Sequence, residues 1–291
     1  MSSTSSMSTT HRHGTRDDAG GAVGRVVRYP LVWMLIGLVG VGAVGGLTAQ
    51  SEPFTPLPVL GAVLAIVLYR AVMRFVAGRR TPEIAGHRAV PEALSGAAIG
   101  LGFVLVSAVV ITALGGYSFT WADVDVLAVM APVAAVACGA AVTEELMFRG
   151  LGIQAVERLL GSWTALAVTA LLFGLMHMLN PGATLWTGLA ISIEAGAMLG
   201  AAFLWRRNLW FVIGLHLAWN TAVGLLGIAV SGHVSPGLLV AHVSGPALLT
   251  GGAFGIEGSL VTVTLGVLLA GLMIVLARRR GTLVPARGPR P

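Results

Sequence analysis

Charged side chains are scarce in this chain of 291 residues. They make up 10% of the residues, whereas 56% are hydrophobic. An ordinary soluble domain carries about 25% charged residues. Because a compact soluble domain needs a larger polar surface than this, lipid has to cover most of the outside. The composition therefore excludes a water-soluble protein and predicts a multi-pass protein of the cell (inner or plasma) membrane.

Lysine is absent, so all 18 basic residues are arginine. They lie in short clusters near the ends of apolar runs. Such clusters are typical of a protein oriented in a bilayer, whereas nucleic-acid binding requires a continuous basic face. We therefore expect the lipid bilayer, and no nucleic acid, as the partner of these arginines. Cysteine occurs once, at Cys138, which excludes an intrachain disulfide and a cysteine-based zinc site; we interpret it as a packing residue.

Apolar runs occupy most of the chain, and a membrane-spanning helix needs about 20 such residues. The sequence predicts an all-α, polytopic bundle of about eight transmembrane helices, whose 40 glycines serve close helix packing. No internal repeat is visible, which disfavours an inverted-repeat transporter. The predicted spans are Leu31–Ala49, Val59–Val76, Leu94–Leu114, Val129–Val156, Trp163–Leu179, Leu185–Trp205, Leu209–Val230 and Leu260–Ala277.

The arginines also predict the orientation of the bundle. Alternate threading of eight spans puts all arginine clusters on one side, and the opposite loops contain none. Because cytoplasmic loops collect arginine, both termini are predicted to be cytoplasmic. The opposite loops hold Glu52, Asp123, Asp125, His233, His242 and Glu257.

Five segments follow from this topology. Residues 1–28 are rich in serine, threonine and histidine and are predicted to be a disordered cytoplasmic tail. Residues 29–124 form the first three helices, and residues 125–225 form a core of helices four to seven. Residues 226–280 contain an extracytoplasmic loop and the last helix, and residues 281–291 are a second cytoplasmic tail.

Polar side chains inside the spans are few, and an ionisable group in lipid by default marks a functional site. On a helix, Glu145 and Arg149 are neighbours on one face, while Glu144 points about 100° away. One carboxylate can therefore pair with the guanidinium and leave the other free for chemistry. A structural ion pair between helices is the alternative. The polar residues inside the spans are Glu144, Glu145, Arg149, His177, Glu194, His216 and Asn220.

Histidine and asparagine supply partners for these carboxylates. His177 ends the sequence FGLMH, and His216 shares a helix face with Asn220 in HLAWN. Each of these groups is costly in lipid, but together they can satisfy one another. We predict that the two glutamates, two histidines and Asn220 surround one cavity. Glu194 lies outside this set and is predicted to be a hydrogen-bonded contact between helices. The alternatives are that it lines the cavity, binds substrate or pairs with a buried donor.

The motifs EExxxR, FxxxH and HxxxN, in this order on successive helices, resemble those of the CPBP family of intramembrane proteases. This family includes CAAX-processing endopeptidases and bacteriocin-processing or immunity-type (Abi-like) proteins. The resemblance covers residues 125–225. It implies that Glu144 and His177 activate a water for attack on a peptide carbonyl, and that Arg149 orients the glutamate pair. It also implies that His216 and Asn220 stabilise the oxyanion, a role that suits hydrogen-bond donors.

The need for a metal is open at this point. His177, His216 and Glu144 or Glu145 offer nitrogen and oxygen ligands for zinc with an open position for water. The family is labelled metalloprotease, yet the chain lacks an HExxH motif, and a glutamate-dependent mechanism without metal uses the same residues.

The favoured function is an intramembrane endopeptidase, a metallo-endopeptidase by its family label. Its expected partner is a membrane-associated peptide or protein substrate. The first alternative is a non-catalytic immunity or partner-binding membrane protein, in which the polar cluster holds the bundle together. The second is a transporter that uses the same groups as a relay.

Overall fold

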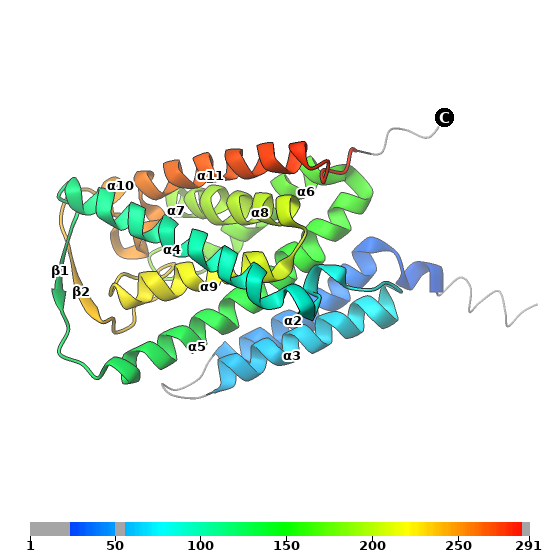
Figure 1. Ribbon diagram of the computed structural model, residues 1–291, viewed down its shortest axis with the longest axis horizontal. Helices are drawn as coiled ribbons and strands as arrows, with labels where there is room; N and C mark the ends of the chain where they lie inside the picture. Colours follow the sequence, from blue (N-terminus) through cyan, green and yellow to red (C-terminus); the bar gives the residue numbers. More distant parts are fainter. Residues whose placement is uncertain (1–23, 50–55, 287–291) are drawn as a thin grey trace, which may run out of the picture.

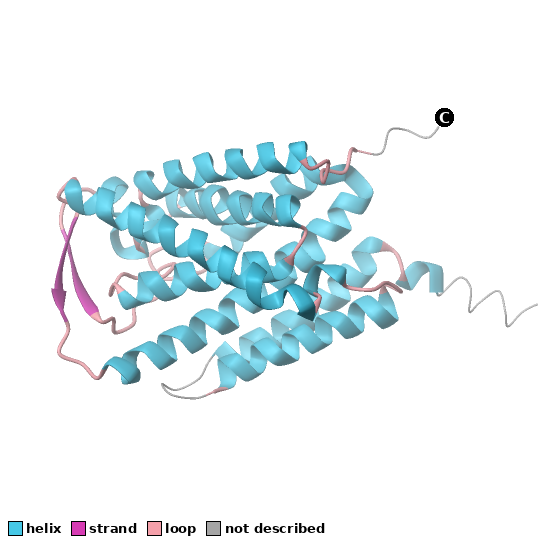
Figure 2. Cartoon of the chain, viewed as in Figure 1, coloured by secondary structure: helices cyan, strands magenta, loops and turns pink. Residues whose placement is uncertain are grey.

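The computed structural model describes residues 24–49 and 56–286, which form a bundle of helices (Figures 1 and 2). The predicted fold class is confirmed. The predicted N-terminal tail lies mostly outside the described residues, although residues 24–27 form a helical turn. The helices are α2 (Pro30–Ala49), α3 (Leu57–Ala71), α4 (Ala89–Ala113), α5 (Val126–Glu145), α6 (Gln154–His177), α7 (Leu185–Ile191), α8 (Met198–Arg206), α9 (Leu209–Leu225), α10 (Ala247–Thr250) and α11 (Leu260–Arg279).

Short π-helical and 3-10 turns connect several of these helices. The π turn η4 joins α5 to α6, and η5 joins α7 to α8. Such turns widen the helix locally and are frequent at functional sites. The turns are η1 (Val72–Val76), η2 (Pro82–Ile84), η3 (Gly86–Arg88), η4 (Leu146–Ile153), η5 (Ser192–Ala197), η6 (Gly252–Phe254) and η7 (Ile256–Gly258).

The described residues contain six helical stretches long and apolar enough to cross a membrane. One of them, Val126–His177, has 52 residues and covers the fourth predicted span and all but the last two residues of the fifth. It breaks at Gly161, where φ is 81° and ψ is 170°, a conformation that glycine adopts at low cost. The helix α9 is shorter, at 17 residues. The span count of eight and the orientation of the termini stay predictions.

One end of the bundle collects the arginine-bearing connections. Arg206 lies 2.7 Å from Glu92, and Arg207 lies 2.6 Å from Glu157. Arg207 also donates to the carbonyl of Thr282, after α11. These contacts join the first turns of α4 and α6, the α8–α9 connection and the C-terminal segment. The helix ends that the predicted topology places on the cytoplasmic side are therefore close together in the structure.

The opposite end carries a small antiparallel sheet, which the sequence patterns did not predict (Figures 1 and 2). The strand β1 (Tyr117–Trp121) pairs with β2 (Leu239–Val243), with Tyr117 opposite Val243. Aromatic and β-branched residues favour a strand here. The buried hydroxyl of Tyr117 donates to the carbonyl of Thr250 and fastens the sheet to α10.

Glycines place α9 directly against α4. A Cβ atom on Gly96 would lie 1.9 Å from a backbone oxygen of α9, and a Cβ atom on Gly100 would lie 2.1 Å from another. Only small residues allow backbones to approach this closely, as the glycine content predicts. This contact sets the position of α9, which carries His216 and Asn220.

Candidate active site

A buried chain of polar side chains links α5, η4 and α9. Arg149 Nη1 lies 2.9 Å from Glu145 Oε1, and the same oxygen lies 2.8 Å from His216 Nδ1. The exposed fractions of Glu145, Arg149 and His216 are 0%, 1% and 6%. The spacing of four residues predicts the first contact, whereas the second arises because α9 packs beside α5. Glu145 therefore orients His216 and is itself held by Arg149.

Arg149 also ties η4 to η5. Its Nη2 lies 2.7 Å from the carbonyl oxygen of Ala195 and 3.0 Å from that of Gly196. Both acceptors lie in η5, where the π turn disturbs the regular α-helical ladder. A buried guanidinium requires such acceptors because its N–H groups have no water to bind.

Phe173, the aromatic residue of FxxxH, lies between the two histidines. Its ring is stacked on His177 with centroids 4.6 Å apart, and it meets His216 edge-on with centroids 6.5 Å apart. The guanidinium of Arg149 lies 4.9 Å from the same ring, a distance suited to a cation–π contact. The Phe173 ring thus separates the two imidazoles and packs against the guanidinium of Arg149.

His177 is held in one tautomer. Its Nδ1 lies 2.8 Å from the carbonyl oxygen of Phe173. Because a carbonyl only accepts hydrogen bonds, Nδ1 donates, and in the neutral imidazole Nε2 keeps its lone pair. The ring therefore presents a basic nitrogen.

His177, His216 and Asn220 line one small cavity of about 10 Å³. This volume is close to the smallest that holds a single water molecule. The sequence motifs FxxxH and HxxxN therefore meet at one point. The other residues that line the cavity are Phe173, Ile191, Ala195, Trp219, Ser231 and Glu257.

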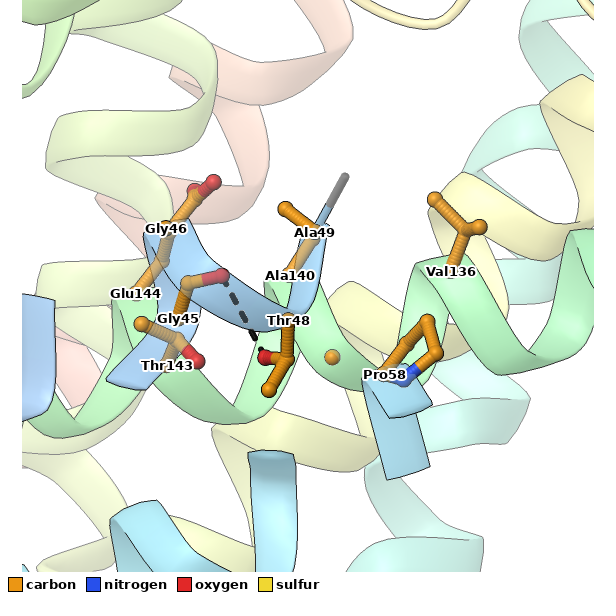
Figure 3. A pocket seen from close by; sticks show the side chains of 10 residues that line it. Gly45, Gly46, Thr48, Ala49, Pro58, Val136, Ala140, Thr143 and Glu144 are labelled. Carbon is orange, nitrogen blue, oxygen red and sulfur yellow. Dashed lines mark hydrogen bonds between the residues drawn. The ribbon is translucent and has the colours of Figure 1, made fainter. Parts of the chain in front are cut away.

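Glu144 lies beside a different cavity, of about 190 Å³, between α2, α3 and α5. Figure 3 shows Glu144 at one end of this cavity and Pro58 at the other. Its side chain is 30% exposed, and its Oε2 lies 3.9 Å from His216 Nε2. The structure thus places Glu144 near His216, but it does not bring Glu144 and His177 to one cavity.

A larger apolar cavity, of about 500 Å³, reaches the site from the end of the bundle that carries β1 and β2. Asn220 lines both this cavity and the water-sized one, and Val136 lines both this cavity and that of Glu144. Substrate sites are commonly apolar with a few polar groups at one end. The residues that line it are Ala128, Val129, Pro132, Val133, Val136, Ala137, Asn220, Gly224, Val230, His233, Val234, Ser235 and Pro236.

Two residues of the water-sized cavity, Ser231 and Glu257, carry no sequence signal, and the predicted topology leaves Glu257 in an outer loop. Glu257 is 2% exposed, and its Oε2 accepts hydrogen bonds from Ser231 N at 2.5 Å and Ser231 Oγ at 2.9 Å. Burial raises the pKa of the Glu257 carboxyl, although the bonds from Ser231 act in the opposite direction. No motif marks either residue, so only the tertiary fold reveals them.

Glu194 corrects a prediction. Its carboxyl group is completely buried, yet neither oxygen has a hydrogen-bond partner among the described residues. The expected hydrogen-bonded contact between helices is therefore absent. Glu194 also does not line the water-sized cavity. Its backbone packs closely against Gly266 of α11, where an added Cβ would lie 2.8 Å from the Cβ of Glu194.

The arrangement of the candidate ligands does not fit a zinc site. Within the part of the chain that the structure describes, no group of three or more histidine, cysteine, aspartate or glutamate side chains could hold a metal ion. Glu144 and His177, two of the three candidate ligands, line separate cavities. Zinc stays a prediction from the family resemblance, and no step of the proposed reaction depends on it.

Comparison with known families agrees with the motifs. Residues 126–222 match the family described as type II CAAX prenyl endopeptidase, Rce1-like. No curated protein and no solved structure shows significant similarity to the chain. The match begins with α5 and ends within α9, so it contains all six predicted site residues and excludes Ser231 and Glu257. Residues 126–222 of this multi-pass membrane protein therefore form a CAAX-protease domain of the Rce1-like type, in agreement with the resemblance of the motifs to the CPBP family.

Proposed function

We propose that this protein is an endopeptidase that hydrolyses a peptide bond of a membrane-associated peptide or protein. The observation that carries the proposal is that His177, His216 and Asn220, from two separate motifs, line one cavity large enough for a water molecule. The CAAX-protease domain supports the class of reaction. The geometry of the side chains supports the following division of roles.

His177 and Glu144 move the protons. The free Nε2 of His177 takes a proton from the water, whose oxygen bonds to the carbonyl carbon of the peptide. The C–N bond then breaks, and the leaving nitrogen receives that proton, so that a carboxyl group and an amine result. Glu144 is the second acid–base group, because its carboxylate lies 3.9 Å from His216 Nε2 and borders the cavity between α2, α3 and α5.

His216 and Asn220 stabilise the oxyanion. His216 Nδ1 donates to Glu145, so in the imidazolium form its Nε2 also carries a proton and can donate to the developing negative charge. Glu145 balances the imidazolium charge, and Arg149 holds Glu145 in place. The amide of Asn220, one turn further along α9, is the second donor. Removal of one such donor costs about 10²–10³-fold in kcat.

The apolar cavities define the substrate class. A cavity of about 500 Å³ that ends at Asn220 has the size of a typical ligand site. Its lining favours the apolar segment of a peptide held in or on the membrane. In the predicted orientation this cavity opens at the extracytoplasmic end of the bundle, where β1 and β2 lie.

Peptide cleavage in liposomes tests the proposal. Purified protein is mixed with two internally quenched probes, an S-farnesylated peptide that ends in a CAAX sequence and an apolar peptide without a lipid. We expect the wild type to cleave at least one probe. We expect Glu144→Gln, His177→Ala and His216→Ala to lose at least about 10²-fold in kcat. The matched control is His242→Ala, at an exposed histidine of β2, which should cleave like the wild type.

Full activity in any of the three site variants would contradict the assigned roles. Absence of cleavage, together with a loss of thermal stability in the alanine variants, would indicate a non-catalytic partner-binding protein. Zinc analysis before and after treatment with 1,10-phenanthroline tests the cofactor. Stoichiometric zinc that is lost together with activity would overturn the roles assigned to these side chains, whereas full activity without zinc supports them.

A further inference from the structure

Glu257 belongs to the connection between α10 and α11, outside the segment that matches the family. We propose that its carboxylate is a further residue of the active site, which accepts a hydrogen bond from the nucleophilic water and holds that water against His177. This inference rests on the proposed function, because it assigns a role within the same reaction.

The cavity brings two hydrogen-bond acceptors to one water position. Glu257 Oε2 accepts both bonds from Ser231, and Oε1 has no partner among the described residues. His177 presents the lone pair of Nε2, because its Nδ1 donates to a carbonyl. A water in this cavity has two protons, one for each acceptor, so a lone pair of its oxygen remains free for attack. His216 and Asn220 line the same cavity as donors for the oxyanion.

The backbone of Ser231 is strained in a way that serves this carboxylate. Its φ is 47°, in the left-handed region that non-glycine residues seldom adopt. Such a conformation is unfavourable by itself and persists where the surrounding structure enforces it, often at active sites. Here it directs both the N–H and the hydroxyl of Ser231 to Glu257 Oε2.

The segment around Glu257 is fixed on both sides. Gly255 has a φ of 105°, and a Cβ atom there would lie 1.9 Å from the carbonyl oxygen of Ala229. Trp186 Nε1 donates to the carbonyl of Gly258 at 2.7 Å. The carboxylate is therefore held in place before substrate arrives, as efficient catalysis requires.

Glu144 does not supply the same function. It lines the apolar cavity of α2, α3 and α5, away from His177. Among the described residues, Glu257 is the carboxylate that lines the cavity of His177. The two glutamates thus have separate tasks, since Glu257 places the water and Glu144 exchanges protons beside His216.

The test compares two buried glutamates at opposite ends of the bundle. Glu257→Gln keeps the size of the side chain and an oxygen that can accept from Ser231. We expect it to lower kcat for the cleaved probe at least about 10²-fold, with an unchanged KM and melting temperature. The control is Glu92→Gln, which weakens the pair with Arg206; it should lose stability but keep the kcat of the folded protein. Added formate should restore part of the kcat of Glu257→Ala.

Three results would overturn the inference. If the wild type cleaves the probe and Glu257→Gln keeps more than half of its kcat, Glu257 does not hold the water, while the proposed function stands. If Glu257→Gln melts well below the wild type and formate does not restore activity to Glu257→Ala, the residue only anchors Ser231. If the wild type cleaves no probe, the proposed function and this inference fail together.

Discussion

Replacement of Arg149 by methionine tests the buried polar chain most directly. Arg149 is 1% exposed and binds the carboxylate of Glu145 and the carbonyls of Ala195 and Gly196. Methionine fills a similar volume, but it leaves a buried carboxylate without its cation. Removal of one partner of a buried ion pair costs about 3–5 kcal/mol, more than the ~1–3 kcal/mol of an unpaired neutral group. We therefore expect Arg149→Met to lower the free energy of unfolding by about 3–5 kcal/mol.

The measurement is unfolding in detergent micelles, followed by circular dichroism and by tryptophan fluorescence. The control is Arg158→Met, because Arg158 is exposed and contacts the ring of Trp33 at 5.7 Å. An exposed cation–π contact contributes about 0.5–1 kcal/mol, so the control should remain close to the wild type.

A loss of less than about 1 kcal/mol in Arg149→Met would refute the reasoning, because an uncompensated buried carboxylate costs more than this. A double-mutant cycle with Glu145→Leu provides an independent check. The double variant should be less destabilised than the sum of the single variants, with a coupling energy of about 0.5–3 kcal/mol. Additive effects would show that the two side chains do not depend on each other.

Two further predictions concern the packing of α9 and the sheet. Gly100→Ala should destabilise the protein and reduce cleavage, because the new Cβ would lie 2.1 Å from a backbone oxygen of α9. The control Gly102→Ala, with open space around it, should be neutral or slightly stabilising. Equal melting temperatures of the two variants would contradict the close contact. Tyr117→Phe should lower stability at neutral pH by about 1–2 kcal/mol through loss of the bond to Thr250. Burial raises the pKa of Tyr117 above the usual value near 10, so this contribution is complete below about pH 10 and is lost as the pH rises towards the folded-state pKa. Because the chain has no lysine, few other side chains titrate in this pH range. Between about pH 9 and 12, the free energy of unfolding in detergent should therefore depend less on pH in Tyr117→Phe than in the wild type. An equal pH dependence in the two proteins would rule out this role of the Tyr117 hydroxyl.

Hydropathy was sufficient to predict a bundle of membrane-spanning helices, because each span has to cover lipid with its own side chains. The boundary between the fourth and fifth spans was harder to place, since Val126–His177 continues through η4 and turns only at Gly161. The β1–β2 sheet was missed because its strands have five residues each, far below the length of a span. Its pairing joins segments more than 100 residues apart in the chain, which no local pattern reports.

The site was predictable in its residue types but not in its pairing. The spacing of Glu145 and Arg149 predicts their contact, because residues four apart share a helix face. The contact of Glu145 with His216 joins α5 to α9 and depends on how the helices pack. Glu194 was expected to be hydrogen-bonded, yet a sequence cannot tell which groups lie opposite a helix face.

The sequence alone determined that this chain lies in a membrane and that a few costly polar groups mark its site, because composition and helical periodicity are local properties. Only the tertiary structure decided that Glu145 accepts the hydrogen bond from His216 Nδ1, while Glu144 lies 3.9 Å from His216 Nε2. It also decided that Glu144 and His177 line separate cavities and that Glu257 reaches the water-sized one. These arrangements depend on close backbone contacts between distant helices and on the left-handed turn at Ser231, and both exist only after the bundle has packed.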